Sequence, residues 1–169
     1  MRKKIYLASP LFNQGERDTN EKMCSTLERW CDVFLPQRDG QLITKLIADG
    51  VAVEVAYELV FRRDIAAIES CDAVVINLDG RSIDEGAAFE IGYAHALSKR
   101  CVGYRTDVRV LLEWGLNPMI VAPLSHVLRN LIELETWASD FARADIGAPT
   151  VSWLTSNNST MRHRKATAS

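Results

Sequence analysis

Ala-Val-Val-Ile-Asn-Leu, residues 73–78, is the stretch that decides the fold, because five of its six side chains are apolar and a turn follows it. Apolar runs of this length are typical of strands buried on both faces of a parallel sheet. A loop from Asp79 to Glu85 follows, and then an apolar helix is predicted at 86–99. This order of strand, loop and helix is the repeating step of a parallel α/β sheet.

The rest of the chain repeats this alternation. Strands are predicted at 4–8, 33–35 and 101–104 and near Val127, and helices at 16–31, 42–49, 53–70 and 131–141. A short helix is expected to open at Asn117 with Pro118 in its first turn, whereas 37–41 is expected to be a loop. The alternation predicts an α/β fold with helices on both faces of a parallel sheet.

Length and composition fit one domain. The chain has 169 residues, of which 47% are hydrophobic and 25% charged, which suits one sizeable core and leaves no room for a second. We expect this domain to span 1–154. Residues 155–169 are rich in Ser, Thr and Asn and then basic, so a disordered tail is expected there.

Charge and cysteine usage narrow the function class. The net charge of -2 gives no electrostatic footprint for nucleic acid or an anionic membrane, so a small-molecule substrate is favoured. The sequence has no apolar stretch of membrane-spanning length and no signal-peptide core at its start. The four cysteines are scattered through apolar segments, which is typical of reduced core thiols in a cytoplasmic protein without zinc or disulfides.

An aspartate interrupts the apolar seam of the helix predicted at 53–70. Asp64 lies in the middle of that seam, and its neighbours three and four residues away are uncharged. The apolar members of the seam are Tyr57, Val60, Phe61, Ala67 and Ile68. Burying an unpaired carboxylate is costly, which points to a functional role. A rotated helix, or an arginine partner elsewhere in the core, are the structural alternatives.

A glutamate stands out in the same way in the helix predicted at 86–99. Glu90 is its only acidic residue and lies between Phe89 and Ile91, and a helix this apolar is expected to be buried all round. We expect the helix dipole to help keep Glu90 ionised as a nucleophile or base. A solvated glutamate on the helix edge is the alternative.

The loop before that helix carries more acids. Asp79, Asp84 and Glu85 follow a predicted parallel strand, and open α/β sheets bind ligands at this end of their strands. Asp84 could equally be a helix N-cap. Gly86 could let a ligand approach the backbone, or could simply pack the helix on the sheet.

A group of carboxylates suits glycosyl transfer, in which one acid attacks the anomeric carbon and another handles the leaving-group proton. The sequence contains no Gly-x-Gly-x-x-Gly motif, phosphate-binding loop, Gly-x-Ser-x-Gly elbow or metal-ligand spacing. Composition alone leaves phosphate or nucleotide binding open as well.

Two segments together carry a family resemblance. Ile-Tyr-Leu-Ala-Ser-Pro-Leu-Phe at 5–12 and Asp-Glu-Gly-Ala-Ala-Phe-Glu-Ile-Gly at 84–92 resemble the nucleoside 2-deoxyribosyltransferases, which move 2-deoxyribose between nucleobases. The similarity extends over about 4–141. It implies a single-domain, flavodoxin-like (Rossmann-like) doubly wound sheet, a role in nucleotide salvage, and no cofactor or metal.

The resemblance also implies roles for individual residues. Glu90 would be the nucleophile that forms a covalent deoxyribosyl enzyme, and Tyr6 the hydroxyl that orients it. Asp64 and Asp84 would bind the base and sugar hydroxyls, one of them passing a proton to the departing base. Phe12 would lie against the base. Asn117 would reach the sugar from a neighbouring subunit, in a homodimer or larger homo-oligomer with shared active sites.

The sequence departs from the family pattern in three places. Leu11 stands where the family often has a second aromatic residue, the chain continues past Trp153, and the region 38–49 matches poorly. Base stacking, a contact from the C-terminus and base selectivity therefore cannot be carried over.

The expected substrates are purine or pyrimidine 2′-deoxynucleosides and free nucleobases. Acidic residues near the 5′ position, among them Asp84, would repel phosphate and favour free nucleosides. Two alternatives remain: an N-hydrolase of ribo- or deoxyribonucleosides that uses the same glutamate with water, and a nucleotide-binding module without turnover.

Overall fold

The structure is a computed structural model, and it describes residues 1–80, 82–107 and 117–144. The predicted tail at 155–169 and the predicted end of the domain at 154 lie outside these residues.

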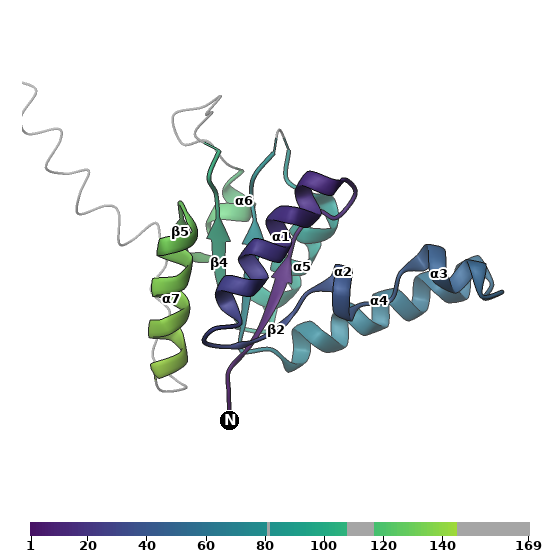
Figure 1. Cartoon of the computed structure of the whole chain (residues 1–169), viewed down its shortest axis with the longest axis horizontal. Coiled ribbons are helices and arrows are strands. Elements are labelled where there is room, and N and C mark those ends of the chain that lie inside the picture. Colours follow the sequence, from purple (N-terminus) through teal and green to yellow (C-terminus); the bar gives the residue numbers. More distant parts are fainter. Residues whose placement is uncertain (81, 108–116, 145–169) are drawn as a thin grey trace, which may run out of the picture.

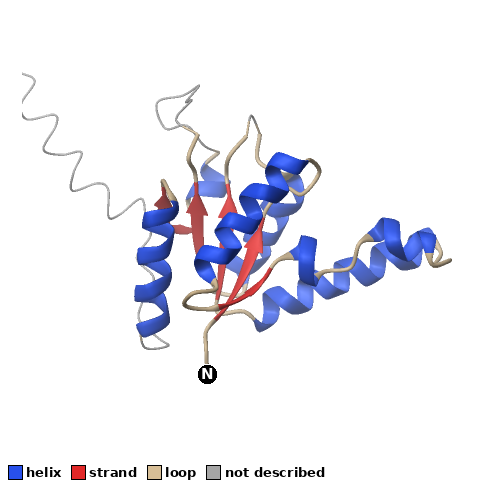
Figure 2. Ribbon diagram, in the orientation of Figure 1, coloured by secondary structure: helices blue, strands red, loops and turns tan. Residues whose placement is uncertain are grey.

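Five parallel strands form one sheet in the order β2-β1-β3-β4-β5, as Figures 1 and 2 show. The strands are β1 (Lys4–Ala8), β2 (Asp32–Phe34), β3 (Ala73–Asn77), β4 (Arg100–Tyr104) and β5 (Leu124–Leu128). The direction of strand succession reverses between β1 and β3, and ligands of open α/β sheets bind at the carboxyl ends of the strands beside such a reversal. The predicted doubly wound α/β sheet is confirmed.

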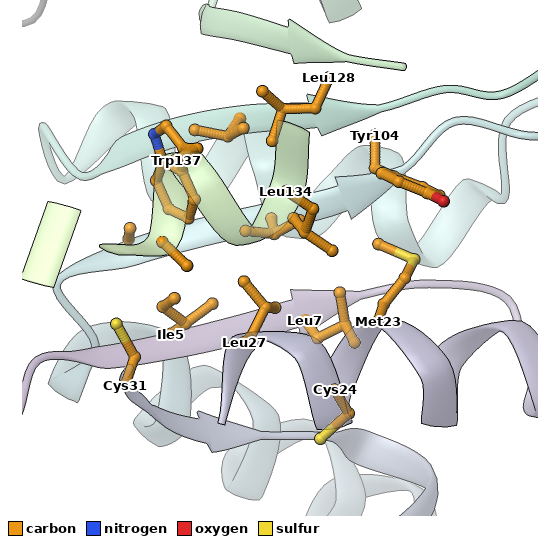
Figure 3. Close-up of a cluster of buried hydrophobic side chains, with 14 of the residues drawn as sticks. Ile5, Leu7, Met23, Cys24, Leu27, Cys31, Tyr104, Leu128, Leu134 and Trp137 are labelled. Atoms are coloured by element: carbon orange, nitrogen blue, oxygen red, sulfur yellow. The ribbon is translucent and has the colours of Figure 1, made fainter. Parts of the chain in front are cut away.

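One face of the sheet is covered by α1 (Gln14–Leu27) and α7 (Leu131–Arg143). Their apolar sides meet the strands in a closely packed core, which Figure 3 shows around Leu7, Leu27 and Leu134. This core contains aliphatic, aromatic and thiol side chains and no carboxylate.

The opposite face is covered by α4 (Val53–Ser70), α5 (Glu85–Ala96) and the short α6 (Pro118–Val121). Ile68, Ala87, Ile91 and Ala94 pack against inward-facing strand residues there. The buried tyrosine Tyr6 belongs to this second core. Both faces are therefore apolar, but only this one receives helices that carry the anomalous acids.

Two predicted segments in the chain's first half differ from the structure. α1 begins at Gln14, because Asn13 and Glu16 form a reciprocal capping box, and it ends at Leu27 rather than Cys31. The predicted loop at 37–41 contains most of a short helix, α2 (Pro36–Asp39), with proline in its first turn.

The predicted burial of α4 and α5 was wrong in part. Tyr57 and Phe61 in the seam of α4 are 60% and 52% exposed, and Phe89 of α5 is 53% exposed. An 18-residue helix is about 27 Å long, whereas five-residue strands span about 17 Å. The first half of α4 therefore runs past the sheet, together with α3 (Ile43–Ala48), as Figure 1 shows.

Among the helices that the structure describes, none is both long and apolar enough to span a membrane.

Candidate active site

A short hydrogen bond joins β1 to α5 at the centre of the candidate site. The Tyr6 hydroxyl donates to Oε1 of Glu90 over 2.6 Å, although 84 positions separate the two residues. Tyr6 is fully buried, and its ring stacks on Phe34, its neighbour across the β1–β2 ladder, at 5.5 Å and 12°. The strand and the ring stack thus hold the tyrosine hydroxyl at a fixed point beneath α5.

Glu90 lies in an environment that disfavours its charge. Burial raises its pKa to about 8, the charges of Asp64 and Asp84 add to the rise, and the hydrogen bond from Tyr6 opposes it. Glu90 is the sixth residue of α5, beyond the first turn where a helix dipole acts most strongly. The expectation that the dipole keeps this carboxylate ionised was therefore wrong, because desolvation dominates.

Asp64 faces the same site from α4. Burial raises its pKa to about 6, and the nearby Arg63 guanidinium acts in the opposite direction. Its Oδ1 atom is buried and accepts no hydrogen bond within the described part of the chain. A buried, unsatisfied carboxylate oxygen is costly in an empty site and is suited to a ligand that brings a donor.

The environment of the Tyr6 hydroxyl favours its protonated form, which can donate a hydrogen bond. Burial first, and then the nearby charges of Glu90 and Asp64, raise its pKa far above the ordinary value. Tyr6 can therefore orient Glu90 but does not compete with it as an anion.

Asp84 serves as the N-cap of α5, and its Oδ2 atom accepts a hydrogen bond from the Ala87 N–H at 2.8 Å. A Cβ at Gly86 would lie 3.1 Å from that same oxygen, so glycine makes room for the cap. Within the described residues, Oδ1 of Asp84 accepts no hydrogen bond. The cap and a ligand contact are therefore compatible, since they use different oxygens.

Asp79 is engaged in the protein itself. Its carboxylate accepts hydrogen bonds from the Thr106 N–H at 2.7 Å, the Thr106 hydroxyl at 2.6 Å and the Asp107 N–H at 2.8 Å. These bonds tie the loop after β3 to the loop after β4. Asp79 thus holds the two loops together and has little capacity left for a substrate.

The side chains of Phe12 and Asn117 do not interact with the carboxylates in the described part of the chain. Phe12 is 78% exposed, and Asn117 caps α6 by accepting a hydrogen bond from the Met119 N–H at 2.9 Å. No hydrogen bond or ring contact joins either residue to Glu90, Asp64 or Asp84 among the described residues. Described contacts and charges therefore link Tyr6 with the three acids, and the roles expected for Phe12 and Asn117 stay predictions.

Sequence reasoning missed Phe34 and Arg63. Phe34 supports Tyr6, and the Arg63 guanidinium lies over the Phe34 ring at 5.8 Å while donating to the Asp39 carbonyl. Both residues line a cavity of about 410 Å³ along β2, whose lining does not include Glu90. The position of Phe34 in the middle of the predicted strand 33–35 was the one signal that could have drawn attention to it.

The sequence as a whole matches one protein family. The family model of the nucleoside 2-deoxyribosyltransferases matches residues 5–149, which is most of the chain. No protein of curated function matches the sequence.

Several solved structures share the fold. A conserved protein from Enterococcus faecalis V583 aligns with a TM-score of 0.70 and 24% identity, covering 83% of this chain and 99% of that one. A 2-deoxyribosyltransferase from Bacillus psychrosaccharolyticus aligns with a TM-score of 0.62 and 24% identity over 78% of this chain and 90% of that one. A CMP N-glycosidase from Clostridium botulinum aligns with a TM-score of 0.52 and 17% identity, covering 80% of this chain and 98% of that one.

At these identities the solved structures establish a common fold and no more, whereas the family model covers the segments that carry Tyr6, Asp64 and Glu90. The predicted resemblance is confirmed: the chain belongs to the nucleoside 2-deoxyribosyltransferase family.

Proposed function

We propose that the protein transfers 2-deoxyribose between nucleobases by a retaining double displacement, with Glu90 as the nucleophile. The hydrogen bond of 2.6 Å between Tyr6 and Glu90 is the observation that carries the proposal. A carboxylate on a largely apolar helix, oriented by a buried hydroxyl and flanked by two more acids, has the parts that glycosyl transfer requires.

In the first displacement, a Glu90 oxygen attacks C1′ of the bound deoxynucleoside. The new C–O bond forms as the C1′–N bond breaks, and the electron pair of that bond leaves with the base. The base takes up a proton as it departs, which Asp64 supplies. The negative charges of Glu90 and Asp84 also stabilise the positive charge that develops at C1′.

In the second displacement, a nitrogen of an incoming base attacks C1′ from the face that the first base left. The C–O bond to Glu90 breaks, its electron pair returns to the carboxylate, and the incoming base releases its proton to Asp64. Two inversions restore the β configuration.

The protonation of the site fits this sequence of steps. Glu90 and Asp64 interact, and with pKa values of about 8 and about 6 the pair holds a single proton near neutral pH. These values place the proton on Glu90 in the free protein, so we propose that it passes to Asp64 when the substrate binds, which leaves Glu90 as the nucleophile and Asp64 as the acid. The chain's own residues thus account for both roles, with no cofactor in the proposal.

Free nucleosides are the proposed substrates rather than nucleotides. Asp64, Asp84 and Glu90 make the site acidic, and a phosphate on the substrate would add further negative charge to it. We expect purine or pyrimidine deoxynucleosides and free bases as reactants, nucleotide salvage as the role and the cytoplasm as the location. The four described cysteines are free and buried, which agrees with a reducing compartment.

The test is chromatography of the products formed from 2′-deoxyinosine with and without adenine, repeated with inosine. Deoxyadenosine formed only when adenine is present establishes base exchange. Free sugar and hypoxanthine without a new nucleoside would make the protein a hydrolase. Turnover of inosine at an equal rate would overturn the specificity for deoxyribose.

Glu90→Ala tests the nucleophile, and Glu85→Ala is the matched control, because Glu85 is an exposed acid on the same helix. We expect the first variant to be inactive and the second to retain activity. Full activity of Glu90→Ala would overturn the mechanism, and binding of deoxynucleosides without any turnover by the wild type would favour a binding module.

A further inference from the structure

The Tyr6 ring rests on an aromatic residue of the neighbouring strand. Tyr6 of β1 and Phe34 of β2 are register partners in the parallel ladder, and both side chains lie on the face that α4 and α5 cover. Their rings stack with centroids 5.5 Å apart and planes 12° apart. Tyr6 therefore contacts Phe34 through its ring and Glu90 through its hydroxyl, which donates over 2.6 Å.

The sheet alone does not hold Phe34 in place. β2 is an edge strand of the sheet and is three residues long. Phe34 is half-buried and lines a cavity of about 410 Å³, whose lining also includes Arg63 and Ala67. A ring that borders a cavity lacks contacting atoms on that side. The Phe34 ring thus has room to tilt, and a tilt would disturb the Tyr6 ring stacked on it.

Arg63 of α4 makes a second contact with the Phe34 ring. Its guanidinium lies over the ring, 5.8 Å from the centroid, and donates to the Asp39 carbonyl over 3.2 Å. Asp39 is fixed in turn, because its carboxylate accepts a hydrogen bond from the Leu35 N–H at 2.9 Å. A cation over an aromatic face is attracted to it, and a planar guanidinium can also stack on the ring. Arg63 is therefore placed to restrain the ring of Phe34.

We propose that Phe34 is a positioning residue for the nucleophile, acting through Tyr6, and that Arg63 restrains the Phe34 ring. The contacts run from α4 through β2 and β1 to α5. This inference rests on the proposed function, in which Glu90 attacks C1′. A Tyr6 ring that can tilt holds its hydroxyl less well against Glu90, and the attack depends on the alignment of that carboxylate.

A double-mutant cycle of base-exchange rates tests the path through Tyr6. Phe34→Leu keeps an apolar side chain but removes the ring, and kcat should fall roughly twofold to tenfold, the effect of one aromatic pair. In the Tyr6→Phe background the same change should leave kcat unaltered, because the hydroxyl that Phe34 positions is gone. An unchanged kcat in the single variant, or an equal loss in both backgrounds, overturns the proposal.

Val33→Ala is the matched control for Phe34→Leu. Val33 is the preceding residue on the same strand, but its side chain packs in the opposite core, against α1 and α7. Both variants weaken the packing of β2, so a merely structural role of Phe34 would make them alike. We expect Val33→Ala to lower stability and to leave kcat at the wild-type value.

The pKa of Glu90 provides a readout that needs no turnover. Three groups act on this carboxyl within the described chain: Tyr6 from β1, Asp64 from α4 and Asp84 at the start of α5. The hydrogen bond from Tyr6 lowers the pKa of Glu90, so a loosened Tyr6 should raise it above the wild-type value in Phe34→Leu and not in the control. Carbon-13 NMR of side-chain carboxyl groups measures this pKa, with the signal of Glu90 assigned by its absence from Glu90→Gln.

Arg63→Lys tests the contact from α4, and Arg62→Lys is its matched control, because Arg62 is an exposed neighbour that bonds elsewhere on α4. Lysine keeps the charge but not the planar group over the ring. We expect Arg63→Lys to raise the pKa of Glu90 by less than Phe34→Leu does, and Arg62→Lys to leave it unchanged. An unchanged pKa in Arg63→Lys overturns the role of Arg63. Since Arg63 is exposed, this variant should fold even if Phe34→Leu does not.

A failure of this inference and a failure of the proposed chemistry are distinguishable. Full activity of Glu90→Ala would overturn the nucleophile, whereas the titration of Glu90 in the wild type and in Phe34→Leu would still decide whether the stacked rings act on this carboxyl. An inactive Glu90→Ala, together with an unchanged pKa of Glu90 in Phe34→Leu, would overturn the positioning role alone.

Discussion

The two faces of the sheet differ in the kinds of side chain that pack against the same strands. On the side of α1 and α7, buried residues such as Leu7, Leu27 and Leu134 pack without any carboxylate. On the side of α4 and α5, the buried Tyr6 bonds to Glu90, and Asp64 keeps a buried oxygen without a partner in the described chain. Buried polar atoms without a partner in the described chain occur on both sides of the sheet, including Oδ1 of Asn20 and Nε1 of Trp30, whereas the three clustered acids lie on the side of α4 and α5.

The largest expected effect is the loss of activity on the site face. Glu90→Ala should lower kcat by at least about a thousandfold, because it removes the carboxylate that is proposed to form the covalent intermediate. The fold should persist, since the change removes a carboxyl group whose burial is unfavourable. Rates of base exchange and circular dichroism measure the two effects, and a loss of both would break the contrast between the faces.

The corresponding change on the opposite face is Leu134→Ala. Leu134 is fully buried, so its truncation should lower the free energy of unfolding by about 2–5 kcal/mol. The variant should keep kcat near the wild-type value at temperatures at which it is folded. Urea unfolding measures the first quantity, and a lowered kcat in the folded variant would mean that the faces are coupled.

Tyr6→Phe should have a smaller effect on rate. It removes the hydrogen bond of 2.6 Å to Glu90 but keeps the ring that stacks on Phe34. A hydrogen bond to a charged group contributes about 1.5–3 kcal/mol, so kcat should fall roughly tenfold to a hundredfold. An unchanged kcat would show that the hydroxyl does not orient the nucleophile.

Stability should depend on pH through Glu90. Its pKa is about 8 in the folded protein against an ordinary 4.5, so folding favours the protonated form. This contribution is complete below the ordinary pKa and is lost as pH rises to about 8. The free energy of unfolding of Glu90→Gln, relative to that of the wild type, should therefore rise by roughly 1–3 kcal/mol as the pH increases from 5 to 9. Melting curves across this range give the sign, and an equal offset at both ends would contradict it.

The smallest expected effect is a change in the shape of the pH profile. For the wild type, kcat/KM should be bell-shaped with limbs at about 6 and about 8, because the active site needs one proton on Asp64 and Glu90 together. Asp64→Asn should lose the alkaline limb, and the acidic limb that remains reports the pKa of Glu90. That pKa should lie below 8, since a neighbouring negative charge is gone. A retained alkaline limb would assign the acid to another residue.

Much of the architecture was predictable because local signals agreed with it. The run at 73–78 predicted β3. Asp64 and Glu90 interrupt apolar patterns, which predicted them as site residues, and the fold brings them close together. The short helix α2 and the start of α1 were missed, because a proline in a first turn and a capping box outweighed the turn-rich composition nearby.

Long-range geometry could not be predicted in the same way. Tyr6 and Glu90 are 84 positions apart, and their contact depends on the strand order that places β1 beside β3 and beneath α5. The engagement of Asp79 with Thr106 depends equally on two loops meeting at neighbouring strand ends. The periodicity of apolar residues describes one helix or strand at a time and does not predict contacts between residues of different elements.

The sequence by itself determined the alternation of strands and helices, the family and the acids that stand out, because each is written in local patterns of polarity and in motifs. Tertiary structure alone decided which oxygens of Asp64 and Asp84 accept no hydrogen bond within the described residues, and where the seam of α4 runs past the sheet. It also set the pKa of Glu90. Burial and the distance between charges fix that value, and both exist only once separate segments have packed together.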